Sequence, residues 1–152
     1  MGTVAEQARS EQGAGSGAAS KENARIHAIA RLTLAFVFLW HGVVPKLLFP
    51  HPDEVRMLMD GGVSVEIAPR LVTALGVFDV ALGLAFLVFW RTRALLIVPI
   101  VLVCGFTAGV ALFSPRFIGA AFTPVTFNLC VAALGAVGYL AARDLPSGRR
   151  GR

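Results

Sequence analysis

Residues 69–113 read PRLVTALGVFDVALGLAFLVFW, RTR and ALLIVPIVLVCGFTAGVALF, which is two apolar runs separated by two arginines. Each run reaches the roughly 20 residues that a helix needs to cross a hydrocarbon core about 30 Å thick. Backbone polar groups in lipid are satisfied within a helix, so we expect Pro69–Trp90 and Ala94–Phe113 to be helical. The three-residue connection predicts an antiparallel hairpin whose two helices are in contact.

Two further apolar runs lie outside this hairpin. One extends from Ile26 or Arg31 to Phe49, and the other begins at Thr123-Pro124 and ends near Ala142. Of the 152 residues 56% are hydrophobic and the mean hydropathy is +0.72, which is too apolar for a soluble domain of this size. The sequence therefore predicts an all-α polytopic membrane protein, an antiparallel four-helix transmembrane bundle surrounded by the lipid bilayer.

The segments outside the apolar runs suggest domain boundaries. Small residues dominate the stretch from Gly13 to Ser20, so we expect residues 1–24 to form a disordered tail. Residues 25–143 then form the membrane domain. Residues 144–152 contain three arginines and form a basic tail.

The distribution of basic residues predicts the orientation. Ten of the 14 Lys and Arg residues lie on the side of the two tails and of the connection at 91–93, and four lie on the other side. Because cytoplasmic segments carry the excess, we expect both termini in the cytoplasm. The connection at 50–68 would lie outside, with a short amphipathic helix at 53–60 resting on the interface.

Several classes of function are disfavoured. The net charge of +5 could suggest a nucleic-acid partner, but the basic residues are spread between apolar runs and form no patch. Cys104 and Cys130 lie on different predicted helices, as small buried hydrophobic residues, and form no CxxC motif. The chain has no phosphate-binding loop, no nucleophile elbow and no paired His at metal-binding spacing, so we expect no metal site.

Two ionisable residues stand out because such side chains are costly inside a bilayer and are candidates for function. They are His41 and Asp79, which we take as candidate catalytic residues. With a rise of about 1.5 Å per residue, His41 lies roughly 15 Å above Arg31 and Asp79 roughly 16 Å above Trp90. The two side chains therefore reach one depth, where burial raises the pKa of a carboxyl and an imidazole can exchange a proton with it.

Two more polar residues complete the candidate site. Asn128 and Lys46 are candidate substrate-binding residues, the latter as a cation at the outer mouth. A structural interpretation stands beside this one, in which the polar residues hydrogen-bond between helices and Lys46 anchors the interface. Gly105 and Gly109 fit a close helix–helix contact.

Three segments carry a family resemblance. They are WHGVVPKLLFP at 40–50, GVFDVALG at 76–83 and TPVTFNL at 123–129. With them, residues 31–142 resemble the DoxX-like family of small bacterial integral membrane proteins. The resemblance implies an association with membrane redox systems, including quinone-linked sulfur oxidation and oxidative-stress complexes. His41 stands where relatives commonly carry an acid, and Asp79 where a longer acid is usual.

The leading hypothesis is a membrane subunit of a quinone-linked or stress-related oxidoreductase system, in which His41, Asp79 and Asn128 handle a proton or a quinone head group. The chain shows no haem, flavin or iron–sulfur ligand set, so we expect no covalently bound cofactor and a separate redox partner that carries the electrons. The alternatives are a small solute or proton transporter or channel, which homo-oligomerisation would favour, and a non-catalytic membrane scaffold. Whether the chain is an enzyme stays open.

Overall fold

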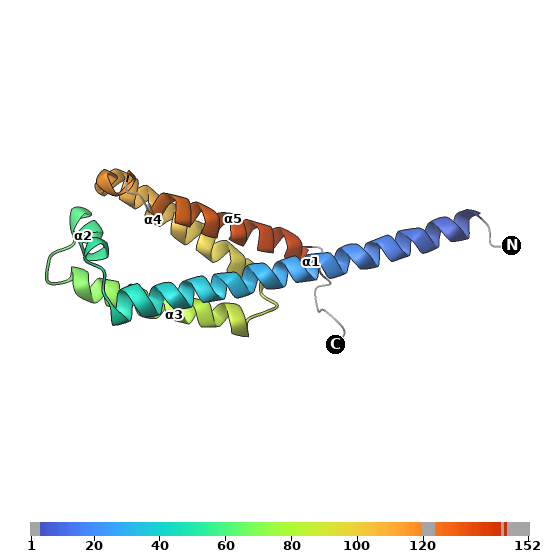
Figure 1. Ribbon diagram of the computed structural model, residues 1–152, viewed down its shortest axis with the longest axis horizontal. Helices are drawn as coiled ribbons and strands as arrows, with labels where there is room; N and C mark the ends of the chain where they lie inside the picture. Colours follow the sequence, from blue (N-terminus) through green and yellow to red (C-terminus); the bar gives the residue numbers. More distant parts are fainter. Residues whose placement is uncertain (1–3, 120–123, 144, 146–152) are drawn as a thin grey trace.

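Helices make up the fold that a computed structural model describes for residues 4–119, 124–143 and 145 (Figure 1). In chain order they are α1 (Val4–Gly42), the π-helix η1 (Val43–Leu48), α2 (Pro52–Asp60), α3 (Ala68–Val88), the 3₁₀ turn η2 (Arg93–Leu96), α4 (Ile97–Phe113), the 3₁₀ turn η3 (Pro115–Phe117) and α5 (Pro124–Arg143). Four stretches are long and apolar enough to cross a membrane, namely Gly15–Leu48, Ala68–Val88, Arg93–Phe113 and Val125–Arg143. The predicted all-α, multi-pass fold is confirmed.

The four long helices pack in the spatial order α3, α1, α5, α4. Helix α1 contacts both α3 and α5, and α4 packs chiefly on α5. Figure 1 shows α1 with α3 in one layer and α4 with α5 in the other, with α2 at the end where the layers separate. Helices α3 and α4 are not among the extensively packed pairs, so the predicted contact across the hairpin is wrong.

Glycines decide which helices approach one another. A Cβ on Gly83 of α3 would lie 3.0 Å from the carbonyl oxygen of Ala35 on α1. A Cβ on Gly135 of α5 would lie 2.9 Å from the carbonyl oxygen of Leu96. These faces allow backbones to meet closely, which is how helices associate in lipid. Around Gly105 and Gly109 of α4 nothing lies within 4 Å, so the helix contact expected there does not exist within the described chain.

A buried arginine joins α1 to the end of α3. Arg31 is 0% exposed, and its guanidinium donates hydrogen bonds to backbone carbonyl oxygens of residues 86, 89, 90 and 92 at 3.1, 2.7, 2.7 and 3.4 Å. The last carbonyls of a helix lack partners within the helix and carry partial negative charge. Arg31 therefore caps the C-terminal end of α3.

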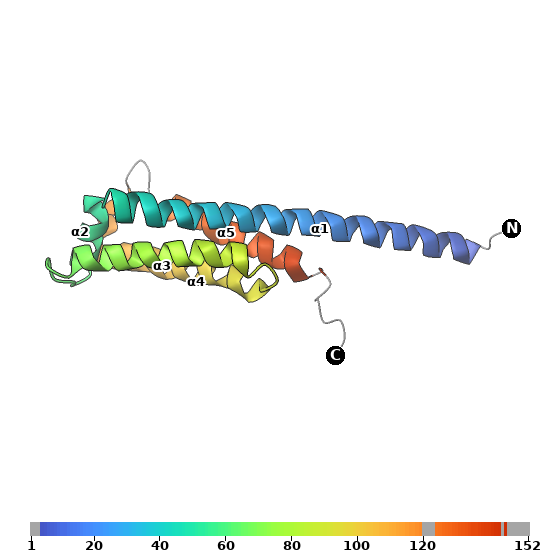
Figure 2. The same ribbon diagram turned by 90° about the horizontal axis from the view of Figure 1, so that it is seen from below.

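The N-terminal part of α1 differs from expectation. The helix begins at Val4, where we expected a disordered tail through residue 24, and Figures 1 and 2 show it extending beyond the other helices. Ala, Glu, Gln, Lys and Arg are strong helix formers, and a segment attached to an existing helix needs no new nucleus. The basic tail expected at 144–152 lies outside the described residues, apart from position 145.

The predicted short amphipathic helix is present as α2. The side chain of His51 caps its start by accepting a hydrogen bond from the backbone N–H of Asp53 at 3.3 Å. At its other end the Asp60 carboxylate accepts a hydrogen bond from the Ser114 hydroxyl at 2.8 Å and forms an ion pair with Arg116. Helix α2 also packs against α3 and α4. Together these contacts hold both of its ends in place.

The outer surface of the bundle is apolar. Large hydrophobic side chains face outward on all four spans, among them Trp40, Val88, Leu112 and Leu140. Lipid tails solvate such side chains, so the surface supports contact with a bilayer. Cys104 and Cys130 are also exposed here as free thiols, which corrects the expectation that both are buried.

Candidate functional site

A π-helix presents the first residue of the site. Pro45 has no N–H to donate, and α1 widens into η1 around it, over Val43–Leu48. The N–H of Phe49 donates to the carbonyl oxygen of Val44, five residues earlier, at 2.9 Å. Such widened turns inside helices are frequently found at functional sites. Here the widened turn carries Lys46.

Lys46 forms an ion pair with Asp79 of α3. The ammonium nitrogen Nζ donates a hydrogen bond to Oδ2 of the carboxylate. The two side chains are only 16% and 12% exposed. A Cβ on Gly76, one turn before Asp79, would lie 2.8 Å from Cβ of Lys46, so the glycine leaves the space that brings the two charges together. The pair thus depends on both the π-helix and the missing side chain.

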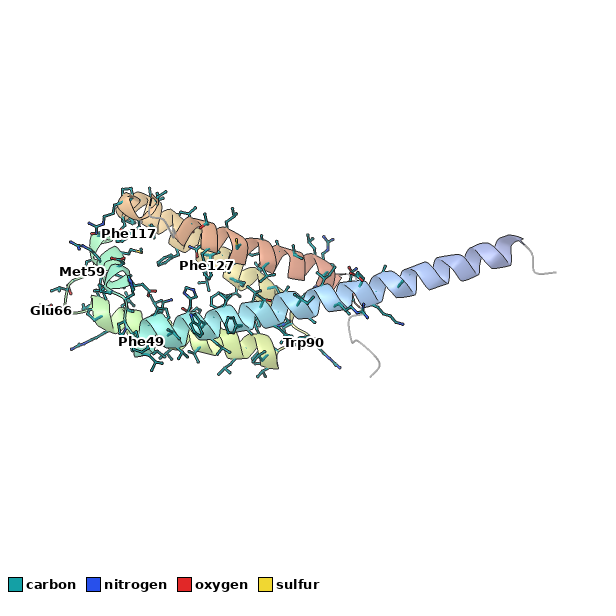
Figure 3. The ribbon with its side chains drawn as sticks, viewed as in Figure 1. Phe49, Met59, Glu66, Trp90, Phe117 and Phe127 are labelled. Atoms are coloured by element: carbon teal, nitrogen blue, oxygen red, sulfur yellow. The ribbon has the colours of Figure 1, made fainter. Side chains whose placement is uncertain are left out.

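His41 lies beside this pair without bonding to it directly. Its ring stacks on Phe127 of α5, with 4.6 Å between ring centroids and 29° between ring planes. Figure 3 shows Phe127 on the side of α5 that faces α1. Lys46 and Asp79 both act electrostatically on the imidazole. The sequence predicted that His41 and Asp79 reach one depth. In the structure the carboxylate of Asp79 is paired with Lys46, a residue that the sequence suggested for substrate binding.

Asn128 belongs to a separate hydrogen-bonded group. It is 8% exposed, and its amide donates to the Thr107 hydroxyl oxygen at 2.9 Å. The Thr107 hydroxyl in turn donates to the backbone carbonyl of Val103 at 2.6 Å. These two hydrogen bonds link α5 to α4, so the Asn128 amide is already bonded to a residue of the neighbouring helix. The candidate residues therefore form two groups, with the stack of His41 on Phe127 between the two layers.

Glu54 is a member of the site that the sequence reasoning missed. It lies on α2, is half-buried and is acted on electrostatically by Lys46, Asp79 and His51. Burial raises the pKa of this carboxyl, while Lys46 lowers it and Asp79 raises it. A signal was available, because Glu54 shares a helix face with Met57 and Leu58, three and four residues on. We name Lys46, Asp79, His41 and Glu54 the Lys46 cluster.

An apolar groove lies between α2 and α4. Its volume is about 480 Å³, and its lining includes Met57, Leu58, Val63, Phe106 and Gly109. The groove holds no ionisable side chain. Within the described residues no three His, Cys, Asp or Glu side chains lie together in a way that could hold a metal ion. The side chains of the cluster themselves offer hydrogen bonds and groups that can exchange protons.

Comparison with known proteins places the chain in a family. It matches the model of the DoxX-like family over residues 35–136, about two thirds of its length, which confirms the resemblance seen in the sequence. No curated protein and no solved structure matches the chain. The matched range contains all four residues of the Lys46 cluster.

Proposed function

The chain belongs to the DoxX-like family, and from that membership we propose that it is a membrane subunit of a quinone-linked or stress-related oxidoreductase system that carries no electrons itself. The Lys46 cluster handles the proton or the quinone head group. A separate redox partner supplies the electrons. The protein lies in a bacterial plasma membrane with both termini in the cytoplasm, an orientation supported by the excess of basic residues on that side.

The observation that carries this proposal is the ion pair between Lys46 and Asp79 inside the bundle. Two apolar side chains of similar volume would pack there without the cost of desolvating two charges, and such replacements are often neutral or stabilising. Stability alone therefore does not require the pair. The charged version adds a carboxylate that can accept a proton and an ammonium that can donate a hydrogen bond.

These groups match what quinone reduction requires. Reduction of a quinone to a quinol consumes two electrons and two protons, and each carbonyl oxygen becomes a hydroxyl. A cation next to the carbonyl stabilises the negative charge that develops on its oxygen. Lys46 fits that role, while Asp79 and His41 are groups that bind and release protons.

The test compares variants for quinone-dependent redox activity in membranes, normalised to the amount of folded protein. Asp79→Asn keeps the size of the side chain and removes its charge, and His41→Ala removes the imidazole. We expect Asp79→Asn to lower activity about 100-fold or more, as the loss of a positioned acid or base does. Asp53→Asn, on an exposed carboxylate of α2, is the matched control and keeps full activity. Activity equal to wild type in folded Asp79→Asn and His41→Ala would leave the pair with a packing role only.

A further inference from the structure

The groove between α2 and α4 has the size and lining of a binding site. Its volume of about 480 Å³ lies within the range of about 300–1,000 Å³ that small-molecule sites occupy, and apolar side chains and glycines line it. Gly105 and Gly109 of α4 form part of its wall. A Cβ added at either position would meet no atom of another described helix within 4 Å. The two glycines therefore widen a space that the neighbouring helices of the described chain leave open.

The length of the groove matches one leaflet of a bilayer. Its lining on α4 extends from Val101 to Phe113. With a rise of about 1.5 Å per residue, these two positions lie roughly 18 Å apart along the helix axis. One leaflet fills half of a hydrocarbon core about 30 Å thick. Because Phe113 ends the span Arg93–Phe113, a lipid tail that enters at the membrane surface can follow the groove towards the centre of the bilayer.

A polar hollow continues the groove at the membrane surface. Its volume is about 210 Å³, it shares Phe113 with the groove, and its lining includes Asp60, Ser114 and Arg116. Asp60 ends α2, which lies at one end of the bundle, where the two layers of helices separate (Figure 1). A lipid needs an apolar surface for its tail and polar partners for its head group. The groove and the hollow provide the two in the order in which a lipid carries them.

The hollow offers one negative and one positive group. The Ser114 hydroxyl and Arg116 both donate to Oδ2 of Asp60, so these two bonds leave Oδ1 of the carboxylate to another donor. Arg116 uses one terminal nitrogen for this pair, and 50% of its side chain is exposed. A guanidinium carries five N–H donors, so the others can meet an acceptor. Because the two charges cancel, the hollow complements a head group that itself carries one charge of each sign.

We propose that the groove and the hollow together bind one phospholipid whose head group carries a phosphate and a primary ammonium. One acyl chain lies in the groove against Gly105 and Gly109, and the other stays in the surrounding lipid. The phosphate accepts hydrogen bonds from Arg116, and the ammonium donates to Oδ1 of Asp60.

Other occupants fit the two parts less well. An anionic phosphatidylglycerol would bring a phosphate next to the Asp60 carboxylate with no ammonium to balance it, and a choline head group has no N–H to donate. A second copy of the chain would bring helices whose outer faces are apolar, and these match the groove but not the charged hollow. The polar end of the groove therefore favours a zwitterionic lipid.

The test measures which molecules stay bound to the full-length protein. The protein is reconstituted in vesicles of equal parts phosphatidylethanolamine, phosphatidylcholine and phosphatidylglycerol with a long-chain ubiquinone added, extracted in mild detergent and analysed by native mass spectrometry. We expect one phosphatidylethanolamine per chain in preference to the others. Gly109→Leu fills the groove and loses this lipid. Ala111→Leu, an exposed position of α4 outside the groove, is the matched control and retains it.

A second variant tests the head group. Asp60→Asn keeps an acceptor for the Ser114 hydroxyl but leaves Arg116 without its counter-charge, so we expect the preference to change from phosphatidylethanolamine to phosphatidylglycerol. If the pair served only to join α2 to the end of α4, the variant would lower thermal stability and leave the ratio of the two lipids unchanged.

Three results would overturn the proposal. The first is equal retention of the three phospholipids by wild type, and the second is retention of phosphatidylethanolamine by folded Gly109→Leu. The third is another occupant, seen either as a bound ubiquinone in place of the phospholipid or as a dimer of the chain that dissociates in Gly109→Leu.

Discussion

Two cations inside the bundle, Arg31 and Lys46, meet different partners. Arg31 at one end of α3 donates to four neutral backbone carbonyls and is completely buried. Lys46 meets the middle of α3, where it binds the carboxylate of Asp79. A backbone carbonyl only accepts hydrogen bonds, whereas a carboxylate is a group that can also accept a proton. The same kind of charge therefore completes the fold at the end of α3 and forms an ion pair with an ionisable group at its middle.

The largest expected effect follows from removing Arg31. Arg31→Met removes the guanidinium donors from the carbonyls at and after the C-terminal end of α3, and each buried polar group that this leaves unsatisfied costs about 1–3 kcal/mol. We expect a steep loss of folded protein and of thermal stability in detergent. Arg31→Lys restores only part of it, because an ammonium cannot match the fork of the guanidinium. If Arg31→Met were as stable as wild type, Arg31 would not be required to complete the fold, and the contrast with Lys46 would be wrong.

A smaller effect is expected from Gly76→Ala. The added Cβ would lie 2.8 Å from Cβ of Lys46, so η1 must shift away from α3. Overpacking of this kind costs about 1–3 kcal/mol, and we also expect weaker proton-linked activity because the ion pair is displaced. Gly105→Ala is the matched control, since nothing lies within 4 Å of that site. Thermal unfolding of the two variants should differ in this direction, and equal stability would contradict the close approach.

The smallest expected effect concerns pH and stability. The pKa of Glu54 is raised in the folded protein above its ordinary value of 4.5. Stability from its protonated form is therefore fully present below that value and is lost as pH rises through the folded pKa. Glu54→Gln should lose less stability than wild type over this interval, while Asp53→Asn follows wild type. The check is the midpoint of thermal unfolding at a series of pH values, and parallel curves for all three proteins would exclude the raised pKa.

The sequence predicted the membrane spans because length and hydropathy are properties of single segments. Packing between helices could not be obtained in the same way. The short connection at 91–93 fixed the chain path, but glycines such as Gly83 and Gly135 determined which helices meet. The partner of Asp79 was missed for a related reason. Depth was estimated for a regular α-helix. The wider turn of the π-helix around Pro45 changes the direction in which the Lys46 side chain projects, and Lys46 therefore meets Asp79 of α3.

The central claim is that Lys46 and Asp79 provide chemistry and are not needed for packing. It is tested most directly by the double variant Lys46→Met with Asp79→Leu, compared with wild type for thermal stability and for quinone-dependent activity in the same membranes. The account predicts stability equal to or above that of wild type, since apolar pairs replace buried ion pairs well, together with loss of activity. A double variant that is folded and fully active would contradict it.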